Sequence, residues 1–293
     1  MSVCDASLAE RLGYGPSDRL VIINCDDLGS SHAANLASLE AMERGIATSG
    51  TLMVPCAWAL EAVELFKGQD VGVHLTLTAE YRGYRWRSLT GAASLHDDQG
   101  FLPRTVAEAR RRADPAEVRG ECRAQIEQAL AWGVDVTHLD AHMGTVQVDE
   151  RFFEIYLEMA EAFRLPLRML GPDVDARLSF RSRAPAAARG LVFPDALFAE
   201  WGRPTDEQMR AEFPRLPPGV AEFLLHPVHD GPELRGYDLT EAEIRIVDQA
   251  CAMDAGIKAL IAAEGLKPIS FRPLRDLQRG EAKAPVAGVL EAN

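Results

Sequence analysis

Cysteine is scarce in this chain and shows no pairing pattern. The 293 residues include five cysteines, and none of them forms a C-x-x-C pair. Scattered cysteines in an odd number fit reduced thiols better than a disulfide framework. The first residues contain no apolar core of signal-peptide length, and no run approaches the roughly 20 apolar residues that cross a bilayer. We therefore expect a cytoplasmic protein that does not span a membrane.

Basic residues are outnumbered by acidic ones. The chain has 31 Lys and Arg residues against 44 Asp and Glu residues, a formal net charge of −13. Proteins that bind nucleic acids or anionic membranes rely on a cationic footprint, so we expect neither as a partner. Residues 104–123 hold most of the local basic charge, but acidic residues interleave there, as on a solvated helix face.

Short apolar runs alternate with longer amphipathic runs, which is typical of strands that alternate with helices. The predicted strands are 19–27, 49–55, 70–77, 134–144, 165–170, 190–198, 219–227 and 267–274. The predicted helices are 33–45, 57–68, 106–132, 149–164 and 240–265, and a long irregular region covers 79–103. Such alternation implies parallel strands with right-handed crossovers.

The fold that this alternation predicts is a single α/β domain over residues 1–293. We expect a distorted (β/α) barrel of seven or so parallel strands, with the active site at the carboxyl ends of the strands. A doubly wound open sheet is the alternative. Residues 1–18 and 281–293 are expected to be loose extensions.

Metal-binding and titratable side chains follow the carboxyl ends of four predicted strands. They are Asp26 and Asp27, His74, the group His138, Asp140 and His142, and His226. Each has an ordinary alternative, since a single histidine at a strand end is usually structural and an aspartate there can cap the next helix. Their joint placement, however, would require four independent accidents at the one edge where α/β proteins bind ligands.

Two imidazoles and one carboxylate form a donor set that suits Zn²⁺, and also Fe²⁺, Mn²⁺ or Co²⁺. A cation also explains why two aspartates stand side by side, because adjacent carboxylates repel each other unless a positive charge lies between them. Three protein ligands leave coordination positions for water and substrate. Such an ion lowers the pKa of its water and polarises a carbonyl oxygen, and the second carboxylate could act as general base.

Four motifs resemble those of the YdjC-like carbohydrate deacetylases. INCDDLG, GVHLTL, THLDAH and LLHP occur in this order between Leu20 and Leu274, and GLKPISFRPL is similar to the closing strand of that family. The resemblance implies a distorted (β/α) barrel. It also implies that a divalent metal assists removal of an acetyl group from an N-acetylated sugar.

By position within the motifs, the resemblance implies Asp27, His74 and His142 as the metal ligands. The expected cofactor is one divalent ion, Zn²⁺ or Mg²⁺, with Mn²⁺, Co²⁺ and Fe²⁺ as further candidates. The expected partner is a small carbohydrate substrate. The oligomeric state, including a homo-oligomer, is left open.

The resemblance also implies the catalytic groups. Asp26 would be the general base, and His226 would act as general acid or position the leaving amine. Arg168 would steady the base or the substrate. The candidate substrate contacts are His138, Asp140, Tyr84 and Trp86. The two aromatic residues could stack on a sugar ring, or could pack within an ordinary surface loop.

One position departs from the family pattern. Members usually continue past the second ligand histidine as H-x-H-x-H, whereas here Gly144 stands where a histidine is expected. This difference alters the expected wall of the substrate-binding site, but it leaves the three implied metal ligands in place.

Three other functions stay open. One is an amidase on a non-sugar substrate, and another is an inactive metal-binding or sugar-binding homologue. The third is a non-haem iron oxygenase, because His138-Leu-Asp140 with a distant histidine imitates its ligand triad. No role is predicted for His32, His96 or His229.

Overall fold

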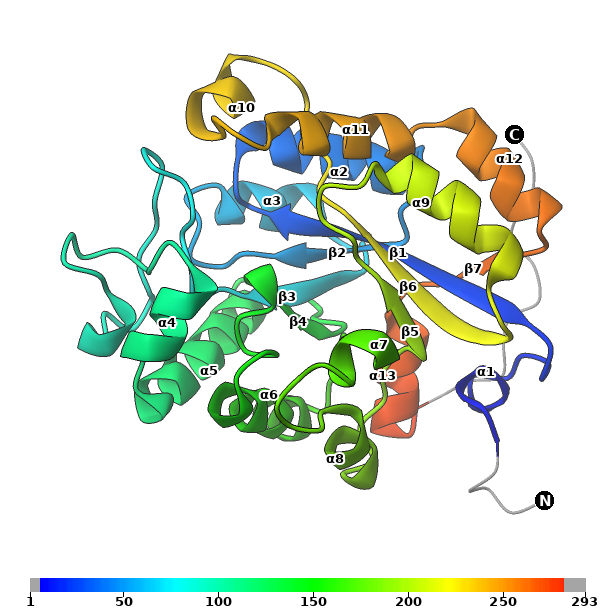
Figure 1. Ribbon diagram of the computed structural model, residues 1–293, viewed down its shortest axis with the longest axis horizontal. Coiled ribbons are helices and arrows are strands. Elements are labelled where there is room, and N and C mark those ends of the chain that lie inside the picture. Colours follow the sequence, from blue (N-terminus) through cyan, green and yellow to red (C-terminus); the bar gives the residue numbers. More distant parts are fainter. Residues whose placement is uncertain (1–5, 282–293) are drawn as a thin grey trace.

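The computed structural model describes residues 6–281, which form a curled parallel sheet surrounded by helices (Figure 1). Neighbouring strands run in the order β4-β3-β2-β1-β6-β5, and β7 pairs with the start of β1. All of these pairings are parallel. The strands are β1 (Arg19–Leu28), β2 (Ser49–Leu52), β3 (Val71–Leu75), β4 (Leu139–Ala141), β5 (Ala196–Phe198), β6 (Gly219–Leu225) and β7 (Lys267–Pro268).

The gap between β4 and β5 is spanned by the segment predicted as a strand over 165–170. This segment makes only an isolated bridge between Leu167 and Leu139 rather than a full strand. The amide of Leu139 donates to the carbonyl of Pro166, and the amide of Leu167 donates to the carbonyl of Val192. The predicted distorted (β/α) barrel is therefore confirmed as a half-barrel whose open side is crossed by irregular chain.

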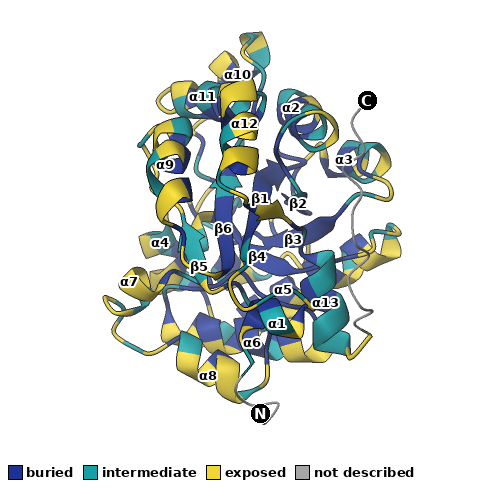
Figure 2. Ribbon diagram, turned by 90° about the vertical axis from the view of Figure 1, so that its right-hand side faces the viewer, coloured by how far each residue is buried: buried dark blue, intermediate teal, exposed yellow. Residues whose placement is uncertain are grey.

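Helices surround the strands, with α2, α3, α9, α11 and α12 above them and α4, α5, α6, α8 and α13 below them in Figure 1. Their outward faces carry the exposed residues, while β1, β2, β3, β4 and β6 are largely buried (Figure 2). The helices are α1 (Leu8–Arg11), α2 (His32–Glu43), α3 (Ala59–Leu65), α4 (Val106–Arg112), α5 (Pro115–Ala131), α6 (Glu150–Phe163), α7 (Pro172–Asp175), α8 (Arg183–Ala188), α9 (Thr205–Glu212), α10 (Pro232–Tyr237), α11 (Ala242–Ala252), α12 (Ala255–Ala263) and α13 (Arg272–Arg279). Among the described helices, none combines the length and apolarity needed to cross a membrane.

Two predicted helices are each divided by an internal aspartate cap. The run 106–132 breaks where the Asp114 side chain accepts hydrogen bonds from two amides at the start of α5, and Pro115 follows at the first helical position. The run 240–265 breaks in the same way at Asp254, which caps α12. Aspartate at such a position satisfies amides that have no partner within the helix.

The ends of the chain differ from their prediction. The segment 1–18 was expected to be loose, but Leu8, Ala9 and Leu12 are buried against the amino-terminal side of the sheet. The predicted last strand is only Lys267–Pro268, because the following residues turn into α13. Residues 1–5 and 282–293 lie outside the described part of the chain, which leaves most of the predicted carboxyl-terminal extension untested.

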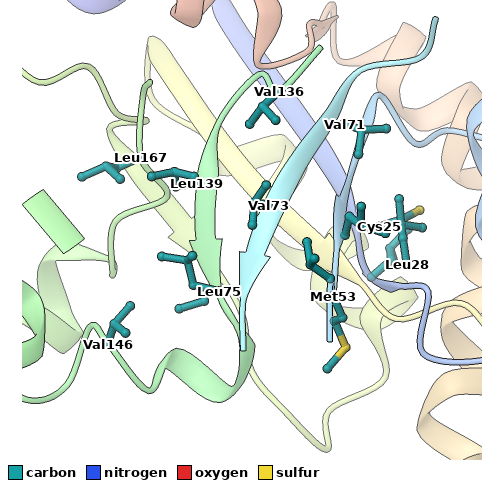
Figure 3. Close-up of a cluster of buried hydrophobic side chains, with 14 of the residues drawn as sticks. Cys25, Leu28, Met53, Val71, Val73, Leu75, Val136, Leu139, Val146 and Leu167 are labelled. Atoms are coloured by element: carbon teal, nitrogen blue, oxygen red, sulfur yellow. The ribbon is translucent and has the colours of Figure 1, made fainter. Parts of the chain in front are cut away.

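The core lies on both sides of the sheet and fixes the strands in register. Figure 3 shows part of it, including Cys25 of β1, Val73 of β3 and Leu139 of β4, all fully buried. The four described cysteines are free thiols within the protein interior. The rigid sheet therefore supports the residues at its carboxyl edge.

Candidate active site

A break in strand alternation brings Asp26 and Asp27 to the same site. Successive side chains of a strand normally point to opposite faces. Asp27 has a left-handed backbone, with φ of 65°, and the pairing of β1 with β2 shifts between Cys25 and Leu28. Both carboxylates can therefore serve one site although they are adjacent in sequence, and such strained backbone is often found at functional sites.

Asp27, His74 and His142, the three residues that the resemblance implies as ligands, converge in the structure. Oδ1 of Asp27 lies 3.4 Å from Nε2 of His74 and 3.2 Å from Nδ1 of His142. All three residues are buried, and their ligand atoms lie within 4.8 Å of one another. Oδ1 of Asp27 is buried with no hydrogen-bond partner. An orphaned carboxylate oxygen facing two imidazole nitrogens fits a divalent cation.

Carboxylates hold the other nitrogen of each imidazole. Nδ1 of His74 lies 2.6 Å from Oδ1 of Asp140, a contact that follows from the register in which these two residues are paired across β3 and β4. Nε2 of His142 lies 2.8 Å from Oε2 of Glu80. This arrangement fixes the ring orientations and leaves Nε2 of His74 and Nδ1 of His142 directed to Asp27.

Arg168 is surrounded by three buried carboxylates. Its Nη1 and Nη2 donate to Oδ2 and Oδ1 of Asp26 at 2.6 and 2.7 Å. Nη1 also lies 2.7 Å from Oδ2 of Asp140, and Nε donates to Oε1 of Glu222 at 2.8 Å. The guanidinium therefore takes the position of a cation within the group formed by Asp26, Asp140 and His74. Of the two groups of described residues that could hold a cation, the one that contains Asp27 has no arginine between its ligand atoms.

The two aspartates keep their negative charge despite their burial. Burial alone would raise the pKa of Asp26, but the positive charge of Arg168 holds that pKa below its ordinary value. Burial would likewise raise the pKa of Asp27, whereas His142, His74 and Arg245 hold it well below its ordinary value. Both groups are therefore available as anions, one beside an arginine and the other facing the imidazoles.

His226 follows β6 and reaches the same site. Its Nε2 lies 3.8 Å from Oδ2 of Asp26, and its Nδ1 lies 3.5 Å from Oδ2 of Asp248. The backbone amide of His226 donates to the same Asp248 oxygen at 2.7 Å. Thr205 donates to the other oxygen of Asp248. Asp248 therefore anchors His226 from the side away from Asp26.

Arg245 of α11 is a second buried arginine at this site. Its Nη1 donates to Oδ2 of Asp27 at 2.8 Å, and its Nε donates to Oδ2 of Asp238 at 3.1 Å. The guanidinium also lies 5.6 Å from the centre of the Trp201 ring. Trp201 is 46% exposed and meets the ring of His226 edge to face at 4.8 Å. An exposed indole therefore stands at the mouth of the site.

Asp140 and His138 do not occupy the positions expected of substrate contacts. Asp140 is fully buried between His74 and Arg168, where it orients these two side chains. His138 is also fully buried, and its ring stacks on Phe271 at 3.7 Å. This placement corrects the prediction for His138, because a fully buried ring stacked on Phe271 leaves no surface for a substrate.

The aromatic residues of the irregular region form a packed wall. Trp86 is 5% exposed, donates its Nε1 hydrogen to the carbonyl of Thr78, and lies 6.2 Å from the ring of His142. Tyr84 is half-buried and donates to the carbonyl of Ser30. Trp86 therefore supports His142 from behind, which corrects its prediction as a sugar-stacking residue. Of the two, Tyr84 alone keeps substantial exposed surface.

The turn after His142 accounts for Gly144. Met143 and Gly144 both have left-handed backbone, with φ of 52° and 64°. A residue with a side chain rarely adopts this conformation, whereas glycine does so without strain. The tight turn therefore favours glycine at the position where family members usually carry a histidine.

The remaining histidines lie outside the site. His32 contacts Glu61, His96 contacts Ser88 and His229 lies near Glu40. Sequence reasoning missed four charged residues that do reach the site, namely Glu80, Glu222, Arg245 and Asp248. Glu222 alone had a visible signal, since it is a carboxylate within an otherwise apolar predicted strand.

Comparison with known proteins identifies the family. The family model described as YdjC-like protein matches residues 20–263. A carbohydrate deacetylase of Thermus thermophilus is 35% identical over 276 residues, covering 92% of this chain and 98% of that protein. A carbohydrate deacetylase of Geobacillus stearothermophilus is 30% identical over 259 residues, covering 87% of this chain and 97% of that protein.

A solved structure shares the fold. A protein of Enterococcus faecalis described as a cellobiose-phosphate cleavage protein superposes with a TM-score of 0.77 at 23% identity, over 88% of this chain and 99% of that chain. The family resemblance seen in the sequence motifs is thus confirmed over most of the chain. This chain belongs to the YdjC-like family of proteins.

Proposed function

We propose that this protein is a carbohydrate deacetylase that uses one divalent cation, held by Asp27, His74 and His142, to remove an N-acetyl group from an amino sugar. The observation that carries the proposal is the buried, unpartnered Oδ1 of Asp27 facing two imidazole nitrogens. Support for the substrate class comes from the relatives named carbohydrate deacetylase, which this chain matches along nearly their whole length.

The two buried aspartates have different tasks in this proposal. When bound at Asp27, the cation would polarise the N-acyl carbonyl and make a water molecule more acidic. Asp26 is not one of the three proposed metal ligands. Its carboxylate is oriented by Arg168 and receives the proton of the attacking water as general base.

His226 is the group that donates a proton to the departing amine. Its Nε2 lies 3.8 Å from Oδ2 of Asp26, and Asp248 anchors the imidazole at Nδ1. Its side chain is 12% exposed, whereas that of Asp26 is 4% exposed. His226 is therefore the more accessible of the two proton-transfer groups, as suits a group that meets the sugar side of the scissile bond.

The test is acetate release from a panel of N-acetylated mono- and oligosaccharides, with N-acetylated amines that carry no sugar as comparison. The proposal expects release from at least one sugar, with loss of activity in Asp26→Asn. Release from the non-sugar amides alone would replace the proposal with a general amidase. A protein that loads metal but releases acetate from nothing on the panel would be an inactive homologue.

A further inference from the structure

The two oxygens of Asp27 have different surroundings. Oδ2 accepts a hydrogen bond of 2.8 Å from Nη1 of Arg245, whereas Oδ1 has no hydrogen-bond partner. Oδ1 is also the oxygen that faces His74 and His142. The arginine thus occupies one oxygen of the carboxylate and leaves the other for a cation.

Arg245 is held firmly in this position. Its Nε donates to Asp238, and its guanidinium lies 5.8 Å from the centre of the Tyr81 ring and 5.6 Å from that of Trp201. The side chain is only 4% exposed. Asp238 is itself fixed, because its other oxygen accepts hydrogen bonds from the amides of Thr240 and Glu241. These contacts come from the segment between α10 and α11 and from two aromatic residues, so Arg245 cannot swing away without breaking several of them.

We propose that Arg245 is a positioning residue that limits Asp27 to ligation through Oδ1 alone and sets a permanent positive charge beside the cation. The inference rests on the proposed metal site and adds a role that the ligand set does not contain. A carboxylate that shares its charge with a guanidinium donates less electron density to a metal. A single ligating oxygen also keeps the coordination number of the cation lower than ligation through both oxygens would.

Arg245 should lower the affinity of the site for the cation and raise the reactivity of the bound cation. The fixed charge of Arg245 repels a divalent cation and so weakens its binding, while it makes the bound cation a stronger Lewis acid. Without Arg245, the buried charge of Asp27 would lose its nearest compensating cation, and both of its oxygens would be free to bind metal. Removing the arginine should therefore tighten metal binding and change the coordination.

The test titrates Co²⁺ alone into metal-free wild-type protein, Arg245→Gln and Arg245→Lys. The visible absorption of Co²⁺ becomes weaker as its coordination number rises. It therefore reports a change in coordination, which the loss of a merely structural residue would not cause. We expect Arg245→Gln to bind Co²⁺ about tenfold or more tightly and with a weaker band. Arg245→Lys, which keeps a cation at this place, should stay near wild type in both measurements.

The proposal requires both tighter Co²⁺ binding and a weaker absorption band in Arg245→Gln. Unchanged or weaker affinity, or an unchanged band, would overturn the proposal. Because metal binding is measured without substrate, failure here differs from failure of the deacetylase proposal, in which the wild-type protein would bind Co²⁺ but release no acetate. An inactive wild-type protein could still show the expected response to the Arg245 substitutions.

A second measurement needs no variant and applies if Arg245→Gln does not fold. The infrared difference spectrum of the wild-type protein with and without Zn²⁺ separates the two modes of carboxylate ligation. Ligation through one oxygen gives a wide separation between the antisymmetric and symmetric carboxylate bands, and ligation through both gives a narrow one. A wide separation supports the proposal, and a narrow one overturns it.

Discussion

Arg168 donates two parallel hydrogen bonds to Asp26, from Nη1 to Oδ2 at 2.6 Å and from Nη2 to Oδ1 at 2.7 Å. Both side chains are about 4% exposed. The amide of Asn24 adds a third hydrogen bond to Oδ1 at 2.8 Å. Such bidentate geometry fixes the orientation of a carboxylate as well as its charge. The proposed general base is therefore held ready before any substrate arrives.

Asp26→Asn should separate catalysis from metal binding. The amide has nearly the same shape but cannot accept a proton as the carboxylate does. We expect acetate release to fall about 10²–10⁴-fold, the range assigned to general acid–base catalysis. The metal content of the purified variant should stay at the wild-type level. Full activity in this variant would show that another group is the base.

Replacing Arg168 should harm both stability and activity. In Arg168→Met, three buried carboxylates would lose their shared cation, and breaking a buried ion pair typically costs about 3–5 kcal/mol. Denaturant unfolding measures this loss. Arg235→Met is the matched control, because Arg235 also contacts two carboxylates but lies at the surface. Equal effects of the two substitutions would argue against the special role of the buried arginine.

Glu222→Gln should change how stability depends on pH. Burial raises the pKa of Glu222 to about 7 from an ordinary value of 4.5, although Arg168 acts in the opposite direction. A carboxyl whose pKa is raised on folding contributes stability that is fully present below pH 4.5 and is lost as the pH rises through about 7. The neutral amide removes this loss, so the variant should gain about 1–3 kcal/mol relative to wild type between pH 5 and pH 8.

Unfolding curves at pH 5 and pH 8 test this expectation, with Glu158→Gln as the control. The hydrogen bond from Arg119 lowers the pKa of Glu158, which therefore contributes stability at the higher pH. Its replacement should produce no gain as the pH rises. A Glu222→Gln variant that also shows no gain would mean that Glu222 is ionised in the folded protein at both pH values.

His226→Ala should affect substrates according to their leaving group. An amine must be protonated as it leaves, whereas the nitrophenolate of p-nitrophenyl acetate leaves without a proton. We expect a loss of about 10²–10⁴-fold on an N-acetylated sugar and a much smaller loss on the ester. Equal losses on both substrates would contradict the general-acid role. Steady-state kinetics on the two substrates decides the matter.

The fold, and the meeting of polar side chains at one edge of the sheet, could be predicted because they depend on local patterns. Parallel strands bring their carboxyl ends to one edge, so the polar side chains that follow these strands could be expected to meet there. The choice of Asp27, His74 and His142 among them came from the resemblance of the motifs. The register of His74 with Asp140 then follows from the pairing of β3 with β4.

The surrounding residues could not be predicted in this way. Arg245 and Asp248 lie on α11, and their contacts with Asp27 and His226 depend on how that helix packs over the sheet. His138 was misjudged for a related reason. It was predicted as a substrate contact beside Asp140, but the strand begins only at Leu139 and the histidine ring stacks on Phe271, the residue before α13.

The central claim is that Asp27, His74 and His142 jointly hold a single catalytic cation. The most direct test measures bound metal and acetate release in the same samples of wild-type protein and Asp27→Ala, after treatment with a chelator and after addition of Zn²⁺ or Mg²⁺. We predict one bound ion per wild-type chain, with activity lost on chelation and restored by metal, and neither binding nor activity in the variant. Undiminished acetate release from metal-free wild-type protein, or wild-type metal binding by Asp27→Ala, would contradict this account.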